Sequence, residues 1–340
     1  MVRSYNFNPC RKATIVSKRK NRKVSRRALL KGAGAAVAAI TASLARVVHA
    51  PRDTLRLVVL CLVAEGHLII EDFPGVGKTM LAKALARSLD CSFSRLQFTP
   101  DLLPSDVTGV NVFNEKTNEF EFRPGPVFAN LLLVDEVNRA SPKTQSALLE
   151  CMQESQVTVD GVSYPLERPF MAIATQNPIE YEGTYPLPEA QLDRFAMRVE
   201  LGYPSLAEEA KMLDEQTHVP PLDSLVPVAG AQDVMRLAAQ AREIYVEDSL
   251  GRYVVALLRQ TRADTRLYLG ASPRAGIALL RVAKARALAD GRDYLVPDDV
   301  KAVAVHVLSH RLILGPEARS AGLDGAAVVA EALEKTPVPV

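Results

Sequence analysis

The segment at residues 72–79 reads Asp-Phe-Pro-Gly-Val-Gly-Lys-Thr, a glycine-rich loop that ends in lysine and threonine. It stands between a short apolar run, Leu68–Ile70, and a run with the apolar spacing of a helix, which includes Leu81 and Leu85. When strand, glycine turn and helix follow in this order, backbone N–H groups can point inward at the helix N-terminus, where they bind phosphate. The segment therefore predicts an α/β domain with a parallel sheet that binds a nucleoside triphosphate.

The residue types in this loop suit a phosphate site. Gly75 and Gly77 allow a tight turn, the Lys78 ammonium can reach the terminal phosphates, and the Thr79 hydroxyl can coordinate Mg²⁺. The strict phosphate-loop pattern has glycine where this chain has Asp72, so an ordinary glycine turn is the alternative if the loop is taken alone. The nucleotide contacts that we expect come from Gly75, Val76, Gly77, Lys78, Thr79 and Met80.

Two acidic residues follow a second apolar run. Leu131–Val134 is typical of a buried strand, and Asp135 and Glu136 come directly after it. The carboxyl ends of the strands in an open α/β sheet face the ligand crevice. Asp135 is suited to hold the Mg²⁺ that bridges the phosphates, and Glu136 is suited to polarise a water molecule for in-line attack. The alternative is that the two carboxylates only solvate the end of a strand.

Further motifs follow a third apolar strand, Phe170–Thr175, and their order along the chain is specific. The motifs are Gly-Val-Gly-Lys-Thr at 75–79, Leu-Val-Asp-Glu-Val-Asn-Arg-Ala at 133–140, Ala-Thr-Gln-Asn-Pro at 174–178, Leu-Asp-Arg-Phe at 192–195 and Gly-Ala-Ser-Pro-Arg-Ala at 270–275. Together they resemble the MoxR family of AAA+ ATPases over about residues 37 to 315. The resemblance implies a P-loop core with a parallel sheet flanked by helices, followed by a smaller all-helical lid domain.

The resemblance implies a role for each matching residue in the core. Lys78 and Thr79 correspond to the Walker A pair, and Asp135 and Glu136 correspond to the Walker B pair. Asn177 matches the polar sensor that helps to place the attacking water. We therefore expect ATP and Mg²⁺ as the bound ligands, with Thr79 and Asp135 at the metal.

Two arginines complete the expected site. Arg194 matches the arginine finger, which in this family reaches the ATP of the neighbouring subunit, and Arg274 matches the second sensor on the lid. A planar, permanently charged guanidinium can stabilise the negative charge that spreads over the phosphate oxygens during transfer. Ser272 and Pro273 predict a helix start, with Arg274 on its first turn and pointing toward the cleft. Each arginine could instead be an ordinary surface or salt-bridge residue.

The apolar pattern changes along the chain and predicts four segments. Residues 1–36 are expected to be a basic, disordered extension, and residues 37–204 the α/β nucleotide-binding core. From residue 205 to 315 the apolar residues recur every three or four positions, as in a helical lid. Residues 316–340 are expected to be a flexible tail.

Two predicted β-hairpins interrupt the core. One joins residues 111–113 to 119–122, and the other joins residues 156–159 to 162–164 through Asp160-Gly161, a strong type I′ turn signal. They resemble the insertions that line the ring in this branch of the family. Such loops could grip a client protein, or they could merely shield sheet edges.

The charge distribution argues against specific nucleic-acid binding. The first 52 residues carry 13 of the 41 lysines and arginines and no acidic residue, so 28 basic residues remain against 39 acidic ones. The body is therefore acidic, which disfavours contact with a phosphate backbone. The basic leader is expected to be a solvated tail.

Part of this leader resembles a targeting signal. Ser25–Lys31 is similar to a twin-arginine export signal, with cleavage predicted after Ala50. However, Ile40–Val48 resembles the first helix of the family, so cleavage would remove part of the ATPase fold, and we expect a cytoplasmic protein. There is no apolar stretch long enough to predict a membrane span. Four cysteines with neither paired nor metal-site spacing are expected to be reduced thiols, namely Cys10, Cys61, Cys91 and Cys151.

The function implied by the resemblance is ATP hydrolysis in a homo-oligomeric ring, usually a hexamer. It includes a chaperone-like remodelling of a protein client, often one with a von Willebrand A domain. Two alternatives remain open. One is a nucleotide-dependent regulatory or scaffold switch with little turnover, against which the presence of Glu136 argues. The other is an ATPase subunit similar to that of magnesium chelatase.

Overall fold

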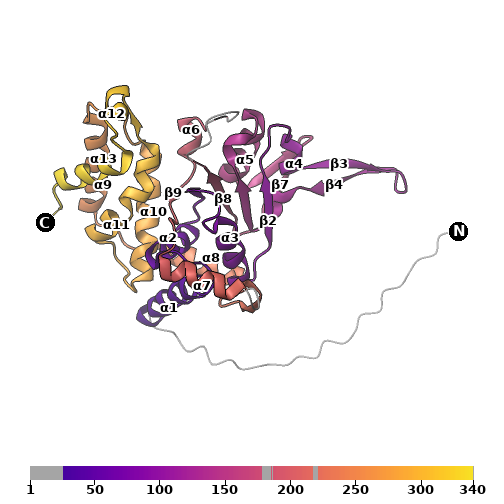
Figure 1. Cartoon of the computed structure of the whole chain (residues 1–340), viewed down its shortest axis with the longest axis horizontal. Helices are drawn as coiled ribbons and strands as arrows, with labels where there is room; N and C mark the ends of the chain where they lie inside the picture. Colours follow the sequence, from indigo (N-terminus) through magenta and orange to yellow (C-terminus); the bar gives the residue numbers. More distant parts are fainter. Residues whose placement is uncertain (1–25, 178–184, 186, 217–220, 340) are drawn as a thin grey trace.

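A five-stranded parallel sheet forms the centre of the computed structural model, which describes residues 26–177, 185, 187–216 and 221–339 (Figure 1). The strands lie in the order β2-β5-β8-β1-β9, and every neighbouring pair is parallel. Their bounds are β1 (Leu68–Glu71), β2 (Phe93–Gln97), β5 (Leu131–Asp135), β8 (Met171–Gln176) and β9 (Met197–Val199). The three strands that the sequence predicts are confirmed as β1, β5 and β8, and they are neighbours in the sheet.

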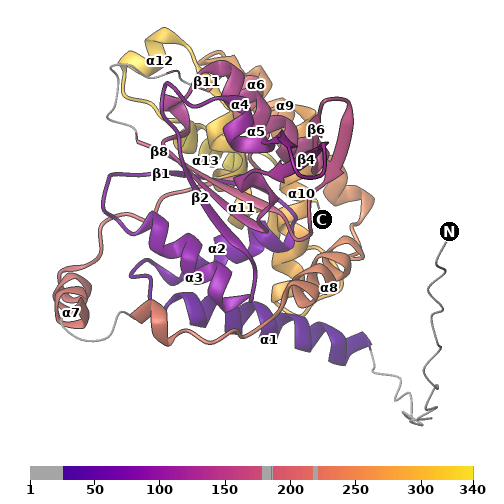
Figure 2. The ribbon, with the colours of Figure 1, turned by 90° about the vertical axis from the view of Figure 1, so that its right-hand side faces the viewer.

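Helices cover both faces of this sheet. In β5, Leu131 and Leu133 belong to one apolar cluster, whereas Leu132 and Val134 belong to the other. Because both faces are buried, each central strand needs apolar residues at successive positions, which is the pattern of a continuous apolar run. The flanking helices are α2 (Arg52–Val63) and α3 (Lys78–Ser88) at the first cluster and α5 (Pro142–Glu154) at the second, on opposite sides of the sheet (Figure 2).

Both predicted hairpins are present. Strands β3 (Gly109–Asn114) and β4 (Glu119–Pro124) pair antiparallel, as do β6 (Gln156–Val159) and β7 (Val162–Pro165). The β3–β4 hairpin extends away from the body of the molecule (Figure 1). At the turn between β6 and β7, Asp160 and Gly161 have φ angles of 49° and 80°. Two successive positive φ values are those of the type I′ turn that the sequence predicts.

Most of the described chain after β9 is helical and forms the lid. Its main helices are α8 (Ala231–Arg242), α9 (Asp248–Ala263), α10 (Pro273–Ala289), α11 (Pro297–Leu308) and α13 (Gly325–Lys335). A short antiparallel pair, β10 (Leu267–Leu269) and β11 (Ile313–Leu314), joins them. We propose, as the sequence suggests, that the lid begins after residue 204. The shorter elements of the chain are α4 (Pro104–Thr108), α6 (Glu189–Leu192), α7 (Leu206–Gln216), α12 (Pro316–Ser320), η1 (Pro126–Phe128), η2 (Val137–Arg139), η3 (Pro221–Ser224) and η4 (Ser309–Arg311).

The prediction of a flexible tail at residues 316–340 is wrong for most of that segment. Helix α13 begins at an N-cap, Asp324, whose carboxylate accepts a hydrogen bond from the Ala327 N–H at 2.7 Å. One face of the helix is buried, with Val329 fully enclosed in the lid core. The alanine-rich composition that suggested fraying is a strong helix-forming composition, and a narrow apolar stripe is enough to dock the helix.

The predicted disordered extension is also shorter than expected. Helix α1 spans Arg26–Leu44, and Ala33 is already buried in the core, although the sequence places residues up to 36 outside the fold. Gly34 lies so close to α10 that an added Cβ would be 2.8 Å from the backbone oxygen of Ala289. Small residues let these helices approach closely, and a hydrophobicity pattern does not reveal such a contact. The expected disorder of residues 1–25 concerns a segment outside the described residues.

Two of the expected thiols pack in the core. Cys61 and Cys151 are free and buried, as the sequence predicts. Burial raises the pKa of each thiol to about 12, because the thiolate would lose its hydration. Within the described residues, no helix is both long enough and apolar enough to cross a membrane.

The docking of α1 can be tested with two glycines of the same helix. We expect Gly32→Ala to raise the free energy of unfolding by up to about 1 kcal/mol, because alanine favours the helix and nothing lies within 4 Å of the new methyl group. Gly34→Ala should lower it by about 1–3 kcal/mol, because the methyl group meets the α10 backbone. Urea denaturation measures both. Equal stabilisation by the two substitutions would contradict the packing of α1 on α10.

Candidate functional site

The glycine loop lies between the carboxyl end of β1 and the start of α3. Gly75 and Gly77 have φ angles of 86° and 97°, values in the left-handed region that glycine adopts without strain. Gly77 is the N-cap of α3, so Lys78 and Thr79 occupy the first turn of the helix. Val76 is buried, and Met80 packs against the core, so these two residues face the site through their backbone. The N–H groups of such a helix start form a ready site for an anion.

Asp72, which departs from the strict loop pattern, anchors the loop. One carboxylate oxygen accepts hydrogen bonds from the Leu201 and Gly202 N–H groups at 2.6 and 2.8 Å. The other accepts a hydrogen bond from the Phe73 N–H at 2.8 Å. The carboxylate thus ties the start of the loop to the chain that follows β9. A glycine at this position would leave those backbone donors without this acceptor.

The Lys78 ammonium lies inside the curve of the loop. It donates hydrogen bonds to the backbone oxygens of Asp72 and Phe73, the second at 3.0 Å. Both acceptors belong to the loop itself, so the charge is held where terminal phosphates would lie above the α3 N-terminus.

The two acids at the carboxyl end of β5 have separate partners. Asp135 is buried, and its carboxylate is paired with Arg95 of β2 at 2.6 Å and accepts a hydrogen bond from the Thr175 hydroxyl at 3.3 Å. Glu136 has a left-handed backbone, with φ of 56° and ψ of 53°. One oxygen of its carboxylate accepts hydrogen bonds from Gln97 at 2.7 Å and from Arg139 at 2.8 Å. The turn in the backbone therefore points consecutive carboxylates to different neighbours.

Strand order brings the third predicted polar residue to the same edge. Strand β8 lies between β5 and β1, with Gln176 opposite Glu71 in the register. Asn177 follows directly, at the carboxyl end of β8. It therefore lies in the row between the loop after β1 and the acids after β5.

The residues at this edge fit a nucleotide with Mg²⁺. Thr79 and Asp135 offer the hydroxyl and carboxylate oxygens that Mg²⁺ prefers. Among the described residues, no group of three or more histidine, cysteine or acidic side chains could hold a metal ion alone. Mg²⁺ in phosphate sites usually takes only one or two protein ligands and completes its shell with phosphate and water, so this sparse donor set is sufficient.

Arg194 lies at the other end of the sheet. Leu68 of β1 is opposite Met197 of β9, and the Ala196 N–H donates a hydrogen bond to the His67 oxygen at 2.8 Å. Arg194 is therefore level with the amino end of β1, whereas the glycine loop follows the carboxyl end. The four residues of β1 separate the two levels by about 13 Å. The Arg194 guanidinium donates a hydrogen bond to the Leu149 oxygen at 2.7 Å.

Arg274 lines the same cavity as Arg194. This cavity of about 990 Å³ lies between the amino end of the sheet and the lid, and His67 and Met152 also line it. Among its described lining residues, none comes from the glycine loop or from the acidic end of β5. Arg274 therefore faces this cavity rather than the glycine loop of its own copy. The lid docks on α1 and α2, and that docking turns the start of α10 toward Arg194.

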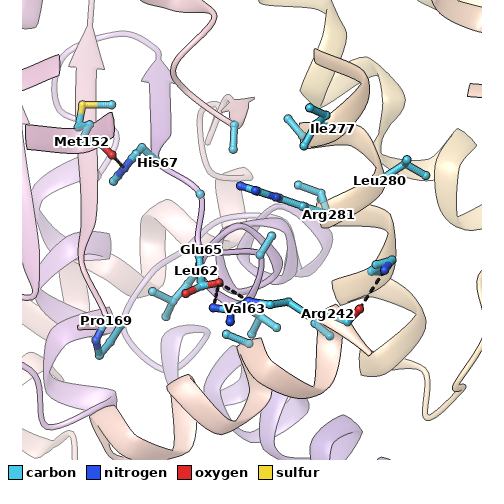
Figure 3. A pocket seen from close by; sticks show the side chains of 18 of the residues that line it. Leu62, Val63, Glu65, His67, Met152, Pro169, Arg242, Ile277, Leu280 and Arg281 are labelled. Atoms are coloured by element: carbon cyan, nitrogen blue, oxygen red, sulfur yellow. Dashed lines mark hydrogen bonds and ion pairs between the residues drawn. The ribbon is translucent and has the colours of Figure 1, made fainter. Parts of the chain in front are cut away.

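The cavity is strongly basic. Arg281, two turns after Arg274 in α10, extends into it (Figure 3). Across the cavity, Arg242 is paired with Glu65, with a hydrogen bond of 2.9 Å (Figure 3). Seven lysines and arginines but only two acids line it, and such an excess of positive charge favours an anion. The basic lining residues are Arg168, Arg194, Arg242, Arg274, Arg281, Lys284 and Arg311.

His67 supports the wall of this cavity. Its Nδ1 accepts a hydrogen bond from the Ala172 N–H at 3.0 Å, so Nε2 carries the proton and donates to the Met152 oxygen at 2.9 Å. Burial lowers the pKa of His67 to about 4, because the charged ring would lose its hydration. The ring is therefore neutral at physiological pH, and it joins two elements of the core.

Sequence reasoning missed three polar residues of these two regions. Gln97 and Arg139 contact Glu136, but Gln97 stands in no motif, and Arg139 lies in the motif at 133–140 without a role assigned to it. The only signal for Gln97 is its place at the end of a strand that pairs with β5. Arg281 could have been found from its spacing, since residues seven apart share a face of a helix.

Comparisons with known proteins find an ATPase core and a lid domain in this chain. Residues 67–197 match the family described as "ATPase family associated with various cellular activities (AAA)". Residues 259–332 match the AAA lid domain, a range that includes α10 and most of α13. A crystal structure of a candidate ATPase from Cytophaga hutchinsonii superposes with a TM-score of 0.85 at 38% identity, covering 92% of this chain and 97% of that chain.

Curated relatives carry the family name. Chaperone MoxR1 of Mycobacterium tuberculosis is 42% identical, over 82% of this chain and 76% of its own length. Protein MoxR of Methylorubrum extorquens is 32% identical, over 83% of this chain and 88% of its own length. An uncharacterized protein of Bacillus subtilis, YeaC, is 50% identical over 87% of this chain and 92% of its own length. With its AAA core, its AAA lid and these relatives, the chain belongs to the MoxR family of AAA+ ATPases.

Proposed function

We propose that this protein hydrolyses ATP in a ring, with each active site shared between two copies of the chain. One observation carries the proposal. The glycine loop and the acids after β5 are at one end of the sheet, whereas Arg194 and Arg274 line a basic cavity at the other end. Neither half is a complete hydrolytic site, but the halves complement each other when copies associate head to tail. Such heterologous contacts close into rings.

Within one copy, the residues at the carboxyl edge bind the nucleotide and position water. The backbone of the glycine loop and Lys78 hold the phosphates, and Asn177 helps to orient the attacking water. The Glu136 carboxylate accepts the proton of that water, with Gln97 and Arg139 holding the carboxylate in place. Mg²⁺, when bound by Thr79 and Asp135, would neutralise charge on the β- and γ-phosphates.

The neighbouring copy supplies the positive charge. Its Arg194 and Arg274 approach the γ-phosphate and stabilise the charge that develops on the phosphate oxygens. This arrangement extends to Arg274 the role in trans that the family resemblance implies for Arg194. The resemblance also supports six copies in the ring.

A protein client is the proposed target of the motor. The mycobacterial relative is named a chaperone, and the β3–β4 hairpin exposes Phe113 and Phe120, which pack edge to face at 5.3 Å between ring centroids. Exposed aromatic residues on a projecting hairpin suit contact with a protein surface. Clients with von Willebrand A domains follow from the resemblance. We place the protein in the cytoplasm, since ATP is required and cleavage after Ala50 would remove α1 from the core.

A nucleotide-dependent switch with little turnover is the second candidate. The ion pair between Glu136 and Arg139, at 2.8 Å, favours it, because Arg139 and Gln97 occupy one oxygen of the carboxylate that would accept the proton. Arg194 and Arg274, at the amino end of the sheet, favour hydrolysis. A switch does not need positive charge at the transition state.

Removal of the general base separates these two candidates. Glu136→Gln keeps the side-chain shape and should bind ATP with unchanged affinity, while steady-state phosphate release falls about 100-fold or more. Glu334→Gln, an exposed position on α13, is the matched control and should turn over normally. Calorimetry measures binding. Equal phosphate release by the two variants would favour the switch.

A mixing experiment tests Arg194. Arg194→Ala should retain nucleotide affinity and lose about 1,000-fold in turnover, the scale of an arginine finger. Lys78→Ala should not bind nucleotide. When both are mixed and rings are verified by light scattering, about one site in four pairs an intact loop with an intact finger, and phosphate release should reappear. If the mixed rings release no phosphate, the result would contradict a shared site.

A second mixing experiment shows whether Arg274 acts on the nucleotide of its own copy or on that of the neighbouring copy. If Arg274 serves the neighbouring nucleotide, Arg274→Ala mixed with Lys78→Ala should recover turnover to a similar extent. If it serves its own nucleotide, no site in the mixture is complete and turnover stays absent. Arg259→Ala, an exposed lid arginine outside this cavity, serves as the control and should keep turnover in unmixed rings.

A further inference from the structure

One carboxylate links Arg194 and Arg274, two of the arginines that line the basic cavity. The Ser272 hydroxyl donates one bifurcated hydrogen bond to the Asp193 carboxylate, with its oxygen 3.1 and 3.0 Å from the two carboxylate oxygens. Asp193 directly precedes Arg194 in the core, and Ser272 stands two residues before Arg274 in the lid. This contact joins core and lid close to both arginines. It therefore sets the distance between Arg194 and Arg274.

The Ser272 hydroxyl both donates and accepts a hydrogen bond. While the hydroxyl donates to Asp193, its oxygen accepts a hydrogen bond from the Ala275 N–H at 3.1 Å, as the N-cap of α10. Pro273 occupies the first helical position with its φ angle already suited to the helix. The first turn of α10, which carries Arg274, is therefore fixed relative to Asp193.

A buried arginine completes the link from the other side. Only 2% of the Arg311 side chain is exposed, and its Nε donates to Asp193 at 2.8 Å. Its two terminal nitrogens donate to the backbone oxygens of Asp193, Phe195 and Ala196 at 3.2, 2.6 and 3.2 Å. The guanidinium thus holds the backbone on both sides of Arg194. The neighbouring lid residue, His310, also contacts the Phe195 oxygen, at 3.1 Å.

This arrangement fixes geometry at a considerable cost in desolvation. A buried ion pair is often no more stable than apolar residues of the same volume, so stability alone is a weak reason for it. Its hydrogen bonds, however, define one position for the segment around Arg194 and one for the start of α10. When a catalytic group is displaced by about 1 Å, the reaction rate can fall about 100-fold.

We propose that Asp193 and Ser272 are positioning residues, which, with Arg311, hold Arg194 and Arg274 as one preformed unit for the γ-phosphate of the neighbouring copy. This inference rests on the proposed function, because it assumes that the two arginines act on a nucleotide bound by another copy. It adds that Arg194 and Arg274 act as a pair, because the contact between Asp193 and Ser272 sets their positions relative to each other.

Ser272→Ala is the main test, in the full-length ring. Its own glycine loop is untouched, so we expect calorimetry to show unchanged affinity for Mg-ATP. Turnover should fall at least about 10-fold, since the start of α10 loses its contact with Asp193 and Arg274 its fixed position relative to Arg194. Ser272→Thr keeps the hydroxyl and should restore turnover. The control Asp324→Ala removes the N-cap of α13, away from the cavity, and should leave turnover unchanged.

A second variant, Ser272→Gly, controls for the loss of the α10 N-cap in Ser272→Ala. Glycine is tolerated at an N-cap far better than alanine, so Ser272→Gly removes the contact with Asp193 while α10 stays capped. It should lose turnover as Ser272→Ala does, with a melting temperature closer to that of the unsubstituted protein. Full activity of Ser272→Gly would overturn the proposal, because a capping role alone then explains the serine.

Two readouts separate positioning from a general structural role. Mixed with Lys78→Ala, the Ser272→Ala protein should regain turnover, because it supplies the intact loop and its partner supplies the intact arginine pair. In a protein that already lacks Arg194 and Arg274, Ser272→Ala should cause no further loss, since residues that act as a unit are not additive.

The outcomes also distinguish this proposal from the shared site on which it rests. If the Arg194→Ala mixture recovers turnover and the Ser272→Ala mixture does not, the shared site stands and the positioning role is overturned. A further loss in the double-arginine background overturns it equally. If the Arg194→Ala mixture fails as well, the shared site itself is wrong, and the positioning role falls with it.

Discussion

The parallel direction of all five strands is the constraint on which the rest of this molecule depends. In such a sheet every carboxyl end lies at one edge and every amino end at the other. The glycine loop, Glu136 and Asn177 follow strands and Asp135 ends one, so they share the first edge. Arg194 precedes a strand, so it is fixed at the second edge. The separation of the two groups follows from topology rather than from the choice of any side chain.

The lid contributes to the second edge because of how it docks. Helices α1 and α2 join core and lid in one apolar cluster, which runs from Ala33 in α1 to the lid helices. Close contacts such as Gly34 against the end of α10 set the orientation of that helix. Its start then meets Asp193, where a serine and a buried arginine hold the two domains together. A basic cavity forms between the domains, away from the edge that carries the glycine loop.

Much of the core could be predicted from the sequence, because local patterns carry it. Continuous apolar runs predict the buried strands, and Asp160-Gly161 predicts a turn with two positive φ values. The expected flexible tail failed for a physical reason. Helix α13 has a narrow apolar stripe, which becomes significant only when a surface exists to cover it. Asp72, a mismatch in the motif, has a structural purpose that depends on Leu201 and Gly202, far along the chain.

By itself the sequence determined the residue types of the site, the order of strand, loop and helix, and the membership of Lys78, Asp135 and Glu136 in one constellation. Those features rest on contacts between neighbours in the chain and on the rule that strand ends meet at one edge. Only the tertiary structure decided the direction of Arg274, the partners of Glu136 and the link from Asp193 to Ser272. These depend on packing between segments tens to hundreds of residues apart, where a shift of one helix moves a charge to another site.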